Sequence, residues 1–600
     1  MKRLPLAAFA ALVVATIAAF FITQHLKATT PVIDGVTRPA PFSDDGDGCQ
    51  IRTSINFYLL HRSDSVSVFV VDSDGDVVQT VASGVHMSKP DPKVSRRTFY
   101  WYGHESDGAL APDGTYHFRI ALADQGRIVD LTQDPILLDT VPPHLVVTGV
   151  SPSQLPAPGG APATVHFTGS KGRGGYLIIY KTGLSGTPQA VDARKIPFSK
   201  ANSGGYTKTW NGLVHGRPAP PGTYVMALKV ADRACVTGTF PAYLPPRAGT
   251  TPHAGVTVSY LAAEPPLDPV IAGSTTVVGV EADRQRYHWA LRHAGSTRKP
   301  ITRGSGTATS LRVRLPGRSA GLYELAIRAG DQRTVVPLVA RAPARSDRIL
   351  VVLPALTWQG ENAVDDDGDG FPDTLVAGGP IELHRPLVDG LPADFSAQAS
   401  LLTYLARVGM PYSLSTDIAL VDGSGPSLSR YTGVVFAGPE RWLPAALAPA
   451  LRRYVEQGGR VLSLGAGSLQ RTAAVRQAPA GLQALNPSPA AATDVLDARP
   501  GALITHNTEA IVSIRDRLGL FNGTSGTFSG FGSFEPFPAV AAPARILSAA
   551  GTTSQTPSIV GYRLGSGVVV DIGLPTFTTS LAHDVDTQEL LRRLWTILAH

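Results

Sequence analysis

Six hundred residues are too many for one hydrophobic core, and a chain of this length is expected to form about four domains. The charged fraction of 17% is below that of an average globular protein, and the net charge of +6 is small for the length. No run of Lys and Arg is interleaved with aromatic residues, so we expect no nucleic-acid partner. The 61 glycines and 49 prolines favour short strands joined by turns over long helices.

The N-terminus carries the clearest signal for a cellular location. Met1-Lys2-Arg3 precedes an apolar run at residues 4–22, which as a helix would reach ~28 Å, close to the hydrocarbon thickness of a bilayer. Because the positive charges precede the run, the rest of the chain should be translocated. We therefore expect a signal anchor at residues 1–28 and a single-pass cell-membrane protein that is mostly extracellular. A cleaved signal peptide followed by secretion is the alternative.

Residues 40–145 and 146–247 are predicted to be two copies of one β-rich unit. Trp101 lies 15 positions before Tyr116, and Trp210 lies 14 positions before Tyr224, with each tyrosine ending a Pro-x-Gly-Thr-Tyr segment. Rings of this size at matching positions are expected to be core anchors. Residues 253–342 contain six candidate strands, a number that suits a third sandwich.

The first two units resemble the Ig-like modules related to the Ig domain of the flagellar hook-capping protein. The resemblance rests on the opening at residues 42–48, on Trp-x-Gly at Trp101 and Trp210, and on Pro-x-Gly-Thr-Tyr. It implies tandem Ig-like sandwiches that serve as spacers and presenters. Cys49 and Cys235 are the only cysteines, and they would fall in neighbouring units, as one disulfide or as two buried thiols.

From residue 348 to residue 600 the pattern changes. Continuous apolar runs at 349–353, 433–438 and 460–465 are typical of strands buried on both faces of a parallel sheet. An amphipathic helix is expected at 445–457 and a closing helix at 587–598. The expected fold class is thus multidomain, with an N-terminal membrane helix, tandem all-β Ig-like sandwiches and a C-terminal α/β domain with a mostly parallel sheet.

The strongest local motif is the acidic loop at residues 365–373. Oxygen ligands at loop positions 1, 3 and 5, a glycine at 6 and a carboxylate at 9 match the first part of a calcium-binding loop. The expected ligands are Asp365, Asp367, Asp369 and Asp373. The alternative is a solvated acidic turn. A second loop, with Asp45 and Asp47, matches less completely because no carboxylate stands three residues after its glycine.

Segments 432–442 and 460–471 resemble the C-terminal domain of the large (beta) subunit of N,N-dimethylformamidase, which has a class I glutamine-amidotransferase-like fold. Glu440 and Trp442 match the family stretch Gly-His-x-Glu-Tyr-Trp, whereas Gly438 stands at the histidine position and Arg441 at the tyrosine position. The resemblance implies an amidase whose iron is held by tyrosine and glutamate. A cation at the tyrosine position argues against iron in this chain.

Reactive groups are sparse in this region. Neither cysteine lies beyond residue 235, which excludes a cysteine nucleophile. Glu440 is a candidate acid or base, with a structural ion pair or a role at a helix start as the alternatives. Ser468 follows a predicted strand, with His506 or His583 as a possible base, but its surroundings are not those of a Gly-x-Ser-x-Gly elbow.

The sequence leaves two hypotheses for the function. The first is a non-enzymatic surface protein whose Ig-like stack presents an amidotransferase-like domain to a ligand, an envelope polymer or a protein partner. The second is an extracellular hydrolase of amide C–N bonds, with its site near Glu440 at the carboxyl ends of the strands.

Overall fold

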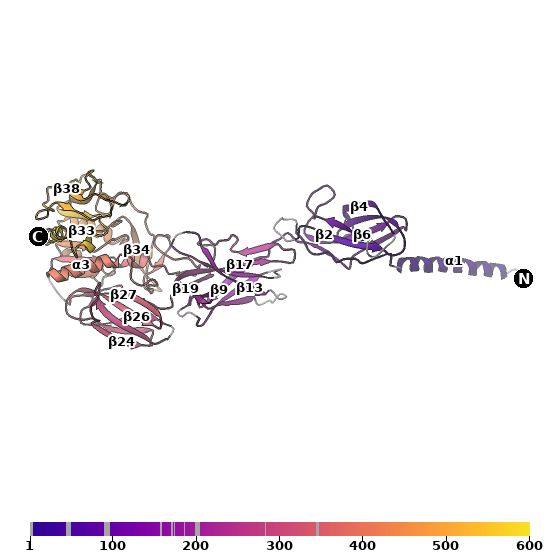
Figure 1. Cartoon of the computed structure of the whole chain (residues 1–600), viewed down its shortest axis with the longest axis horizontal. Coiled ribbons are helices and arrows are strands. Elements are labelled where there is room, and N and C mark those ends of the chain that lie inside the picture. Colours follow the sequence, from indigo (N-terminus) through magenta and orange to yellow (C-terminus); the bar gives the residue numbers. More distant parts are fainter. Residues whose placement is uncertain are drawn as a thin grey trace.

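The structure is a computed structural model, and it describes residues 4–29, 31–43, 50–88, 96–155, 159–169, 172, 174–184, 186–197, 205–282, 284–343, 347–479 and 481–600. The chain is elongated (Figure 1). Helix α1 lies at one end and is followed by a first and a second β unit, while a third β unit lies beside the C-terminal domain at the other end. Most of the regular structure is β.

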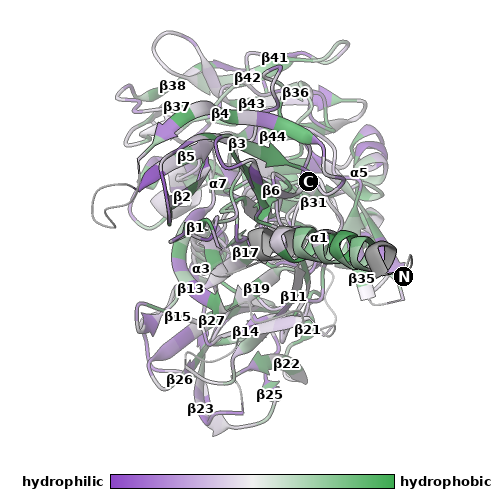
Figure 2. Cartoon of the chain, turned by 90° about the vertical axis from the view of Figure 1, so that its right-hand side faces the viewer, coloured by the Kyte–Doolittle hydropathy of each residue, from purple (hydrophilic) through white to green (hydrophobic). Residues whose placement is uncertain are grey.

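Helix α1 spans Leu4–Thr29 and projects from the first unit (Figure 1), and its described part is coloured largely as hydrophobic in Figure 2. No helix among the described residues, however, is both long enough and apolar enough to cross a membrane. The expected anchor at 1–28 is therefore wrong, and so are the single-pass membrane location and the membrane partner derived from it.

The first two β units each contain two main sheets. In the first unit the sheet orders are β1-β2-β5 and β4-β3-β6-β7, with β8 beside β6. Its strands are β1 Ile33–Asp34, β2 Thr53–Leu59, β3 Asp64–Val71, β4 Val77–Met87, β5 Arg97–Trp101, β6 Gly114–Leu122, β7 Arg127–Asp130 and β8 Ile136–Leu138. In β2 and β3 buried side chains alternate with partly exposed ones, as expected for strands with one face on a core.

In the second unit the orders are β14-β11-β9 and β10-β19-β17-β12-β13, with β18 beside β17, and β15 and β16 form a separate hairpin. The strands are β9 Leu145–Ser151, β10 Gln154–Leu155, β11 Ala163–Gly169, β12 Gly174–Lys181, β13 Gln189–Pro197, β14 Tyr206–Trp210, β15 Leu213–Val214, β16 Arg217–Pro218, β17 Gly222–Ala231, β18 Thr237–Phe240 and β19 Gly255–Val258. We expected β19 in the third unit, but it pairs with β17 of the second.

The repeated Trp and Tyr side chains occupy matching places in the two units. Trp101 and Trp210 are fully buried, and their rings lie 4.9 and 5.1 Å from those of Tyr116 and Tyr224. Each indole N–H donates to the carbonyl three residues later, at 2.8 and 3.0 Å. Each tyrosine hydroxyl donates to a proline carbonyl four residues earlier, at 2.6 Å. The prediction that both tryptophans are core anchors is confirmed.

Replacing Tyr224 with Phe should lower the free energy of unfolding of the second unit by about 1 kcal/mol, because the hydrogen bond from the buried tyrosine to the carbonyl of Pro220 is lost. Urea unfolding of the full chain measures the change. Tyr176→Phe is the matched control, since Tyr176 lies in the same unit and its side chain is exposed. Equal effects of the two substitutions would contradict the role given to the buried hydroxyl.

The third unit has sheets of order β20-β22-β25 and β21-β27-β26-β23-β24. Its strands are β20 Ala262–Glu264, β21 Val270–Ile271, β22 Thr275–Glu281, β23 Tyr287–His293, β24 Thr302–Gly306, β25 Ser310–Arg314, β26 Gly321–Ala329 and β27 Gln332–Arg341. One end of the second sheet packs on the C-terminal domain, where Leu322 and Val339 join that domain's core.

The C-terminal domain is built on a nine-stranded sheet of order β30-β28-β31-β33-β44-β43-β42-β38-β39. The first five strands in this order, from β30 to β44, are parallel to one another. The last four, from β43 to β39, pair in antiparallel fashion. The strands are β28 Ile349–Leu353, β30 Ser413–Thr416, β31 Gly433–Phe436, β33 Arg460–Leu464, β38 Ile511–Asp516, β39 Thr527–Phe528, β42 Ile546–Gly551, β43 Pro557–Leu564 and β44 Gly567–Ile572. The expected fold class is therefore wrong, because the molecule is mostly β and this sheet is mixed. The antiparallel half comes from residues 511–564, whose short strands show no clear period.

Helices and smaller sheets surround this sheet. The helices are α2 Ala355–Gly360, α3 Phe395–Val408, α4 Ala419–Asp422, the 3-10 helix η1 Leu428–Arg430, α5 Leu447–Glu456, α6 Phe577–Ser580 and α7 Val585–Ala599. The remaining strands are β29 Ile381–Glu382, β32 Leu443–Pro444, β34 Thr472–Ala478, β35 Gly481–Leu485, β36 Ala498–Arg499, β37 Ile504–Thr505, β40 Ser533–Phe534 and β41 Ala539–Val540.

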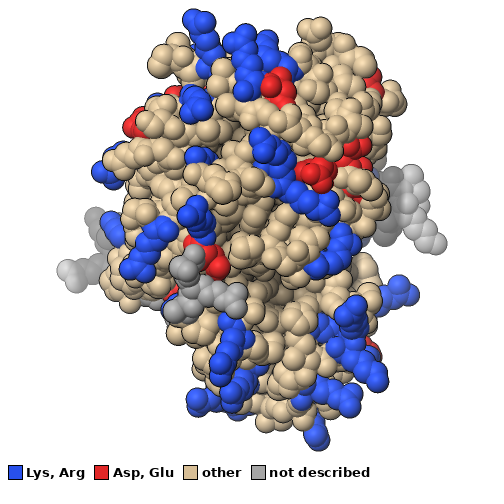
Figure 3. All heavy atoms as spheres, turned by 90° about the vertical axis from the view of Figure 1, so that its left-hand side faces the viewer, with Lys and Arg blue, Asp and Glu red and all other residues tan. Residues whose placement is uncertain are grey.

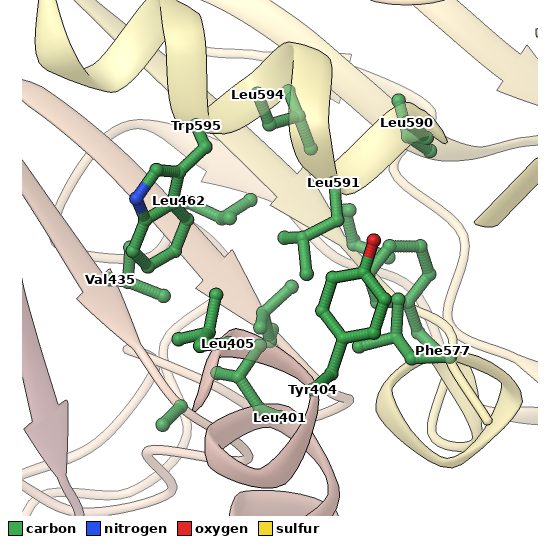
Figure 4. Close-up of a cluster of buried hydrophobic side chains, with 14 of the residues drawn as sticks. Leu401, Tyr404, Leu405, Val435, Leu462, Phe577, Leu590, Leu591, Leu594 and Trp595 are labelled. Atoms are coloured by element: carbon green, nitrogen blue, oxygen red, sulfur yellow. The ribbon is translucent and has the colours of Figure 1, made fainter. Parts of the chain in front are cut away.

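The parallel strands are buried on both faces. Val435 and Leu462 point to one side, where they meet Leu401, Leu405 and other side chains of α3 and α7 (Figure 4). The alternate residues of the same strands join a second core with α5. Two-sided burial explains the continuous apolar runs of the sequence, and it fixes the carboxyl ends of these strands at one edge.

Candidate functional site

Two carboxylates lie at the carboxyl ends of neighbouring parallel strands. Asp417 directly follows β30, and Glu440 lies four residues after β31; both are fully buried. The Asp417 carboxylate accepts hydrogen bonds from the backbone N–H groups of Leu356, at 3.1 and 3.2 Å, and Ile418, at 2.9 Å. The Glu440 carboxylate accepts none from a described donor.

Burial governs the protonation of this pair. It raises the pKa of Asp417 to about 6, and burial together with the charge of Asp417 raises the pKa of Glu440 well above its usual range. Two adjacent buried carboxylates cannot both be ionised cheaply, so the pair holds a proton near neutral pH. Such a pair can exchange a proton, but neither member reaches the surface.

Ser468 is a turn residue in this structure. Its hydroxyl donates toward the carbonyl oxygens of Leu464, at 3.3 Å, and Gly465, at 3.1 Å, and accepts from the backbone N–H of Glu440 at 3.2 Å. No histidine among the described residues is hydrogen-bonded to it. The structure therefore does not bring Ser468 together with His506 or His583.

Arg441 is clamped between two carboxylates. Its Nε and Nη2 atoms donate to Glu361, at 2.5 and 2.6 Å, and its Nη1 atom lies 2.6 Å from a carboxylate oxygen of Asp394. Glu361 caps the C-terminus of α2, and Asp394 is the N-cap residue of α3. The clamp therefore joins the exit of β31 to two helices.

A cavity of about 350 Å³ lies beside Arg441. Gln398 lines it and is fully buried, yet neither its amide nitrogen nor its amide oxygen has a partner among the described residues. The indole nitrogen of Trp358, also in the lining, is buried and unpartnered as well. Leu184 of the second unit and the exposed Asp389 also line the cavity. Sequence reasoning missed Gln398 and Asp389, because isolated polar residues in no motif give no signal.

The acidic loop brings together three of the four predicted metal ligands. One carboxylate oxygen each of Asp365, Asp367 and Asp373 lie within 4.8 Å of one another. Burial, with the neighbouring carboxylates adding to it, raises the pKa of Asp365 to about 7 and that of Asp373 to about 6. Asp369 is not in this group, and its two oxygens accept hydrogen bonds from the backbone N–H groups of Gly249 and Phe371, both at 2.7 Å.

The same loop joins the second unit to the C-terminal domain. Thr251 and Thr182 donate through their hydroxyls to the carbonyls of Asp369 and Gly370, at 2.7 and 2.6 Å. A Cβ atom on Gly370 would lie 2.6 Å from the Cβ of Val225. On the other side, the buried Arg385 lies 2.6 Å from an oxygen of Asp366. Sequence reasoning missed Arg385, which no motif marks.

The second, weaker metal loop was predicted at Asp45 and Asp47, which lie outside the described residues. Of the two cysteines, Cys49 also lies outside them, and Cys235 is disulfide-bonded.

Glu440→Gln should stabilise the protein, with a larger rise in melting temperature at pH 8 than at pH 5. A carboxyl with a raised pKa binds its proton more tightly in the folded protein than in the unfolded chain. Its contribution to stability is therefore greatest below the unfolded pKa of 4.5 and falls as the pH rises toward the folded value. The neutral amide of glutamine avoids this loss, so the free energy of unfolding at pH 8 should rise by about 1–3 kcal/mol.

Melting curves of the full chain at the two pH values measure this effect. Glu589→Gln, at a partly exposed carboxylate of the same domain, is the control and should change little at either pH. A lower melting temperature of Glu440→Gln at pH 8 would contradict the protonated pair.

Comparison with known proteins supports the two resemblances inferred from the sequence. Residues 301–490 match the family described as N,N-dimethylformamidase beta subunit-like, C-terminal. Basal-body rod modification protein FlgD of Salmonella typhimurium is 29% identical over 109 residues, which are 17% of this chain and 44% of that protein, and the Salmonella typhi protein matches equally. The chain thus spans less than half the length of these curated relatives, and the Ig-like resemblance is supported in part.

Structural likenesses are weak. A beta-galactosidase from Bacillus circulans sp. alkalophilus shares 15% identity with a TM-score of 0.25, over 44% of this chain and 31% of that one. A fragment of Escherichia coli alpha-2-macroglobulin, with domains MG0-NIE-MG1, shares 10% identity with a TM-score of 0.17, over 52% and 99%. Neither likeness bears on the function of this chain.

The iron that the family implies does not fit the residues present. Arg441 stands at the position of the tyrosine ligand, and a guanidinium group has no lone pair to offer a metal. Its three short contacts with Glu361 and Asp394 hold it there. Glu440, the remaining family match with a carboxylate, is fully buried and does not line the cavity.

Proposed function

We propose that the N,N-dimethylformamidase-like domain of this chain binds a small cationic amide in the cavity beside Arg441 and does not hydrolyse it. The clamp on Arg441 by Glu361 and Asp394 carries the proposal, because it fixes a permanent cation where the family has a metal ligand. The β units then serve to present this binding domain.

The chemistry of the lining supports this class of ligand. Glu361, Asp389 and Asp394 outnumber Arg441, the one basic residue of the described lining, so the wall has a net negative charge that favours a cation. Gln398 offers one buried N–H₂ group and one buried carbonyl, which is the complement of another amide. A buried polar group without a partner is costly, so a ligand that satisfies Gln398 gains affinity from it.

Lysinamide, a primary amide with ammonium groups, is a suitable probe. Calorimetry with the full chain should show saturable binding, and Gln398→Leu and Asp389→Asn should each weaken it by about tenfold or more. Asp331→Asn, at an exposed carboxylate of the third unit, is the matched control and should leave affinity unchanged. Absence of binding, or equal weakening by all three variants, would overturn the assignment of the cavity.

Hydrolysis of an amide C–N bond is the second candidate. It is supported by the family match at 301–490 and by the paired carboxylates Asp417 and Glu440 at the strand ends. Ammonia release from lysinamide separates the two functions. Our proposal expects no release above the uncatalysed rate. Release that is lost in Glu440→Gln would establish the hydrolase instead.

The acidic loop is proposed to hold a structural Ca²⁺ through Asp365, Asp367 and Asp373. Three carboxylates within 4.8 Å repel one another unless a cation neutralises them, and hard oxygen ligands suit calcium. Bound there, the ion would stiffen the junction of the second unit with the C-terminal domain.

Asp367→Asn and Asp369→Asn should therefore behave differently. Asp367→Asn should lower calcium affinity by about tenfold or more, because it removes a ligand charge. Asp369→Asn should lower the melting temperature by weakening the bond to Gly249 while calcium affinity stays near that of the wild type. Calorimetry and melting curves with calcium or chelator measure both, and loss of calcium binding in Asp369→Asn alone would refute this ligand set.

A further inference from the structure

The positive charge of the chain is concentrated in the third unit. Residues 275–342 contain 12 Lys and Arg and 4 Asp and Glu, a net charge of +8, whereas the whole chain has +6. Blue side chains accordingly crowd the lower part of Figure 3, where the third unit lies, with few red ones among them.

Among the described residues, these cations have no carboxylate partner, although Arg328 donates through Nε to the carbonyl of Gly330 at 3.0 Å. Within the described residues 284–343, no lysine or arginine forms an ion pair with a carboxylate, although such pairs occur in the first and second units and in the C-terminal domain. Glu324, an acidic residue of the unit, accepts a backbone hydrogen bond from Gly295 at 2.8 Å. Asp331, in the exposed turn after β26, is not within ion-pair distance of either neighbouring arginine.

Strand register places several of the cations on one face of the sheet. In antiparallel pairs, Arg328 of β26 is opposite Arg333 of β27 and His288 of β23, and His288 is opposite Ser305 of β24. All four side chains are exposed. They form one row across four strands, about 4.8 Å apart from strand to strand.

The next row on this face places Arg303 of β24 opposite Ala290 of β23, which is opposite Ala326 of β26. We name the face formed by Arg303, His288, Arg328 and Arg333 the basic face. Its four members stand on β27, β26, β23 and β24, and Ser305, Ala290 and Ala326 lie among them. Like charges directly opposite each other, as in Arg328 and Arg333, destabilise a sheet. Folding therefore gives no reason for this arrangement.

We propose that the basic face binds a linear acidic polysaccharide. Arginine forks pair with carboxylate groups through two parallel hydrogen bonds, and several in a row fit an anion that repeats along a chain. Single-stranded nucleic acid fits less well, because no large aromatic ring among the described residues of this unit is exposed to stack on bases. A lipid surface also fits less well, because Ser305, Ala290 and Ala326, which lie among the basic side chains, are small and offer little to insert.

Calorimetry of the full chain with polygalacturonate, and with neutral dextran of similar length, tests the proposal. Wild-type protein should bind polygalacturonate with an affinity that falls as salt rises, and should not bind dextran. The triple variant Arg303→Gln, Arg328→Gln, Arg333→Gln should lose about tenfold or more in affinity. The control Arg312→Gln, Arg314→Gln, Arg318→Gln removes the same charge from β25 of the other sheet and its following loop, and should lose less than about threefold.

Four results would overturn the proposal. Equal losses in both triple variants would show a dependence on net charge alone. Absence of binding at low salt would remove the site. If duplex DNA or anionic vesicles bind more tightly than polygalacturonate, and the basic-face variant weakens that binding too, the basic face belongs to another partner. The melting temperature of the basic-face variant should equal or exceed that of the wild type, because repulsion is relieved, and a lower value would show that these arginines serve the fold.

Discussion

The ion pairs of Arg441 with Glu361 and Asp394 are the constraint on which the candidate site depends. A partly buried guanidinium needs opposite charges close by, because desolvation of an unpaired cation is costly. Glu361 ends α2, and Asp394 uses its carboxylate here rather than to cap α3. The clamp therefore sets the spacing of α2, α3 and the exit of β31, and with it the size and charge of the cavity.

The acidic loop gives the chain a second rigid point. Hydrogen bonds from Gly249 and Thr251 to Asp369 tie it to the second unit, and Arg385 ties it to the C-terminal domain. Leu184, which reaches the cavity wall, belongs to the second unit. The β units are thus more than spacers, because one of them forms part of the wall of the candidate site.

Features that depend on residues close together in the sequence could be predicted from it. The Trp and Tyr spacing revealed the repeated cores, and continuous apolar runs revealed strands buried on both faces. The spacing of the acidic loop found Asp365, Asp367 and Asp373, but it also included Asp369, whose partner Gly249 lies 120 residues away. The apolar run at 4–22 was wrongly interpreted as a membrane span, since no described helix has the length and apolarity that a span needs.

Features that arise from tertiary contacts were not accessible from the sequence. The antiparallel half of the large sheet is assembled from short strands without a clear period, such as β38 and β42. Gln398 and Asp389 stand in no motif, and only the fold brings them to one cavity. Arg441 was recognised as a departure from the family pattern, but its two partners come from positions 80 and 47 residues earlier in the chain.

The iron content of the purified full chain, after expression with iron supplied, tests the central claim most directly. Arg441→Tyr, which restores the family residue, is measured alongside. The account predicts that wild-type protein carries no stoichiometric iron, because a clamped arginine occupies the ligand position. One iron per wild-type chain, lost in Glu440→Gln, would contradict it.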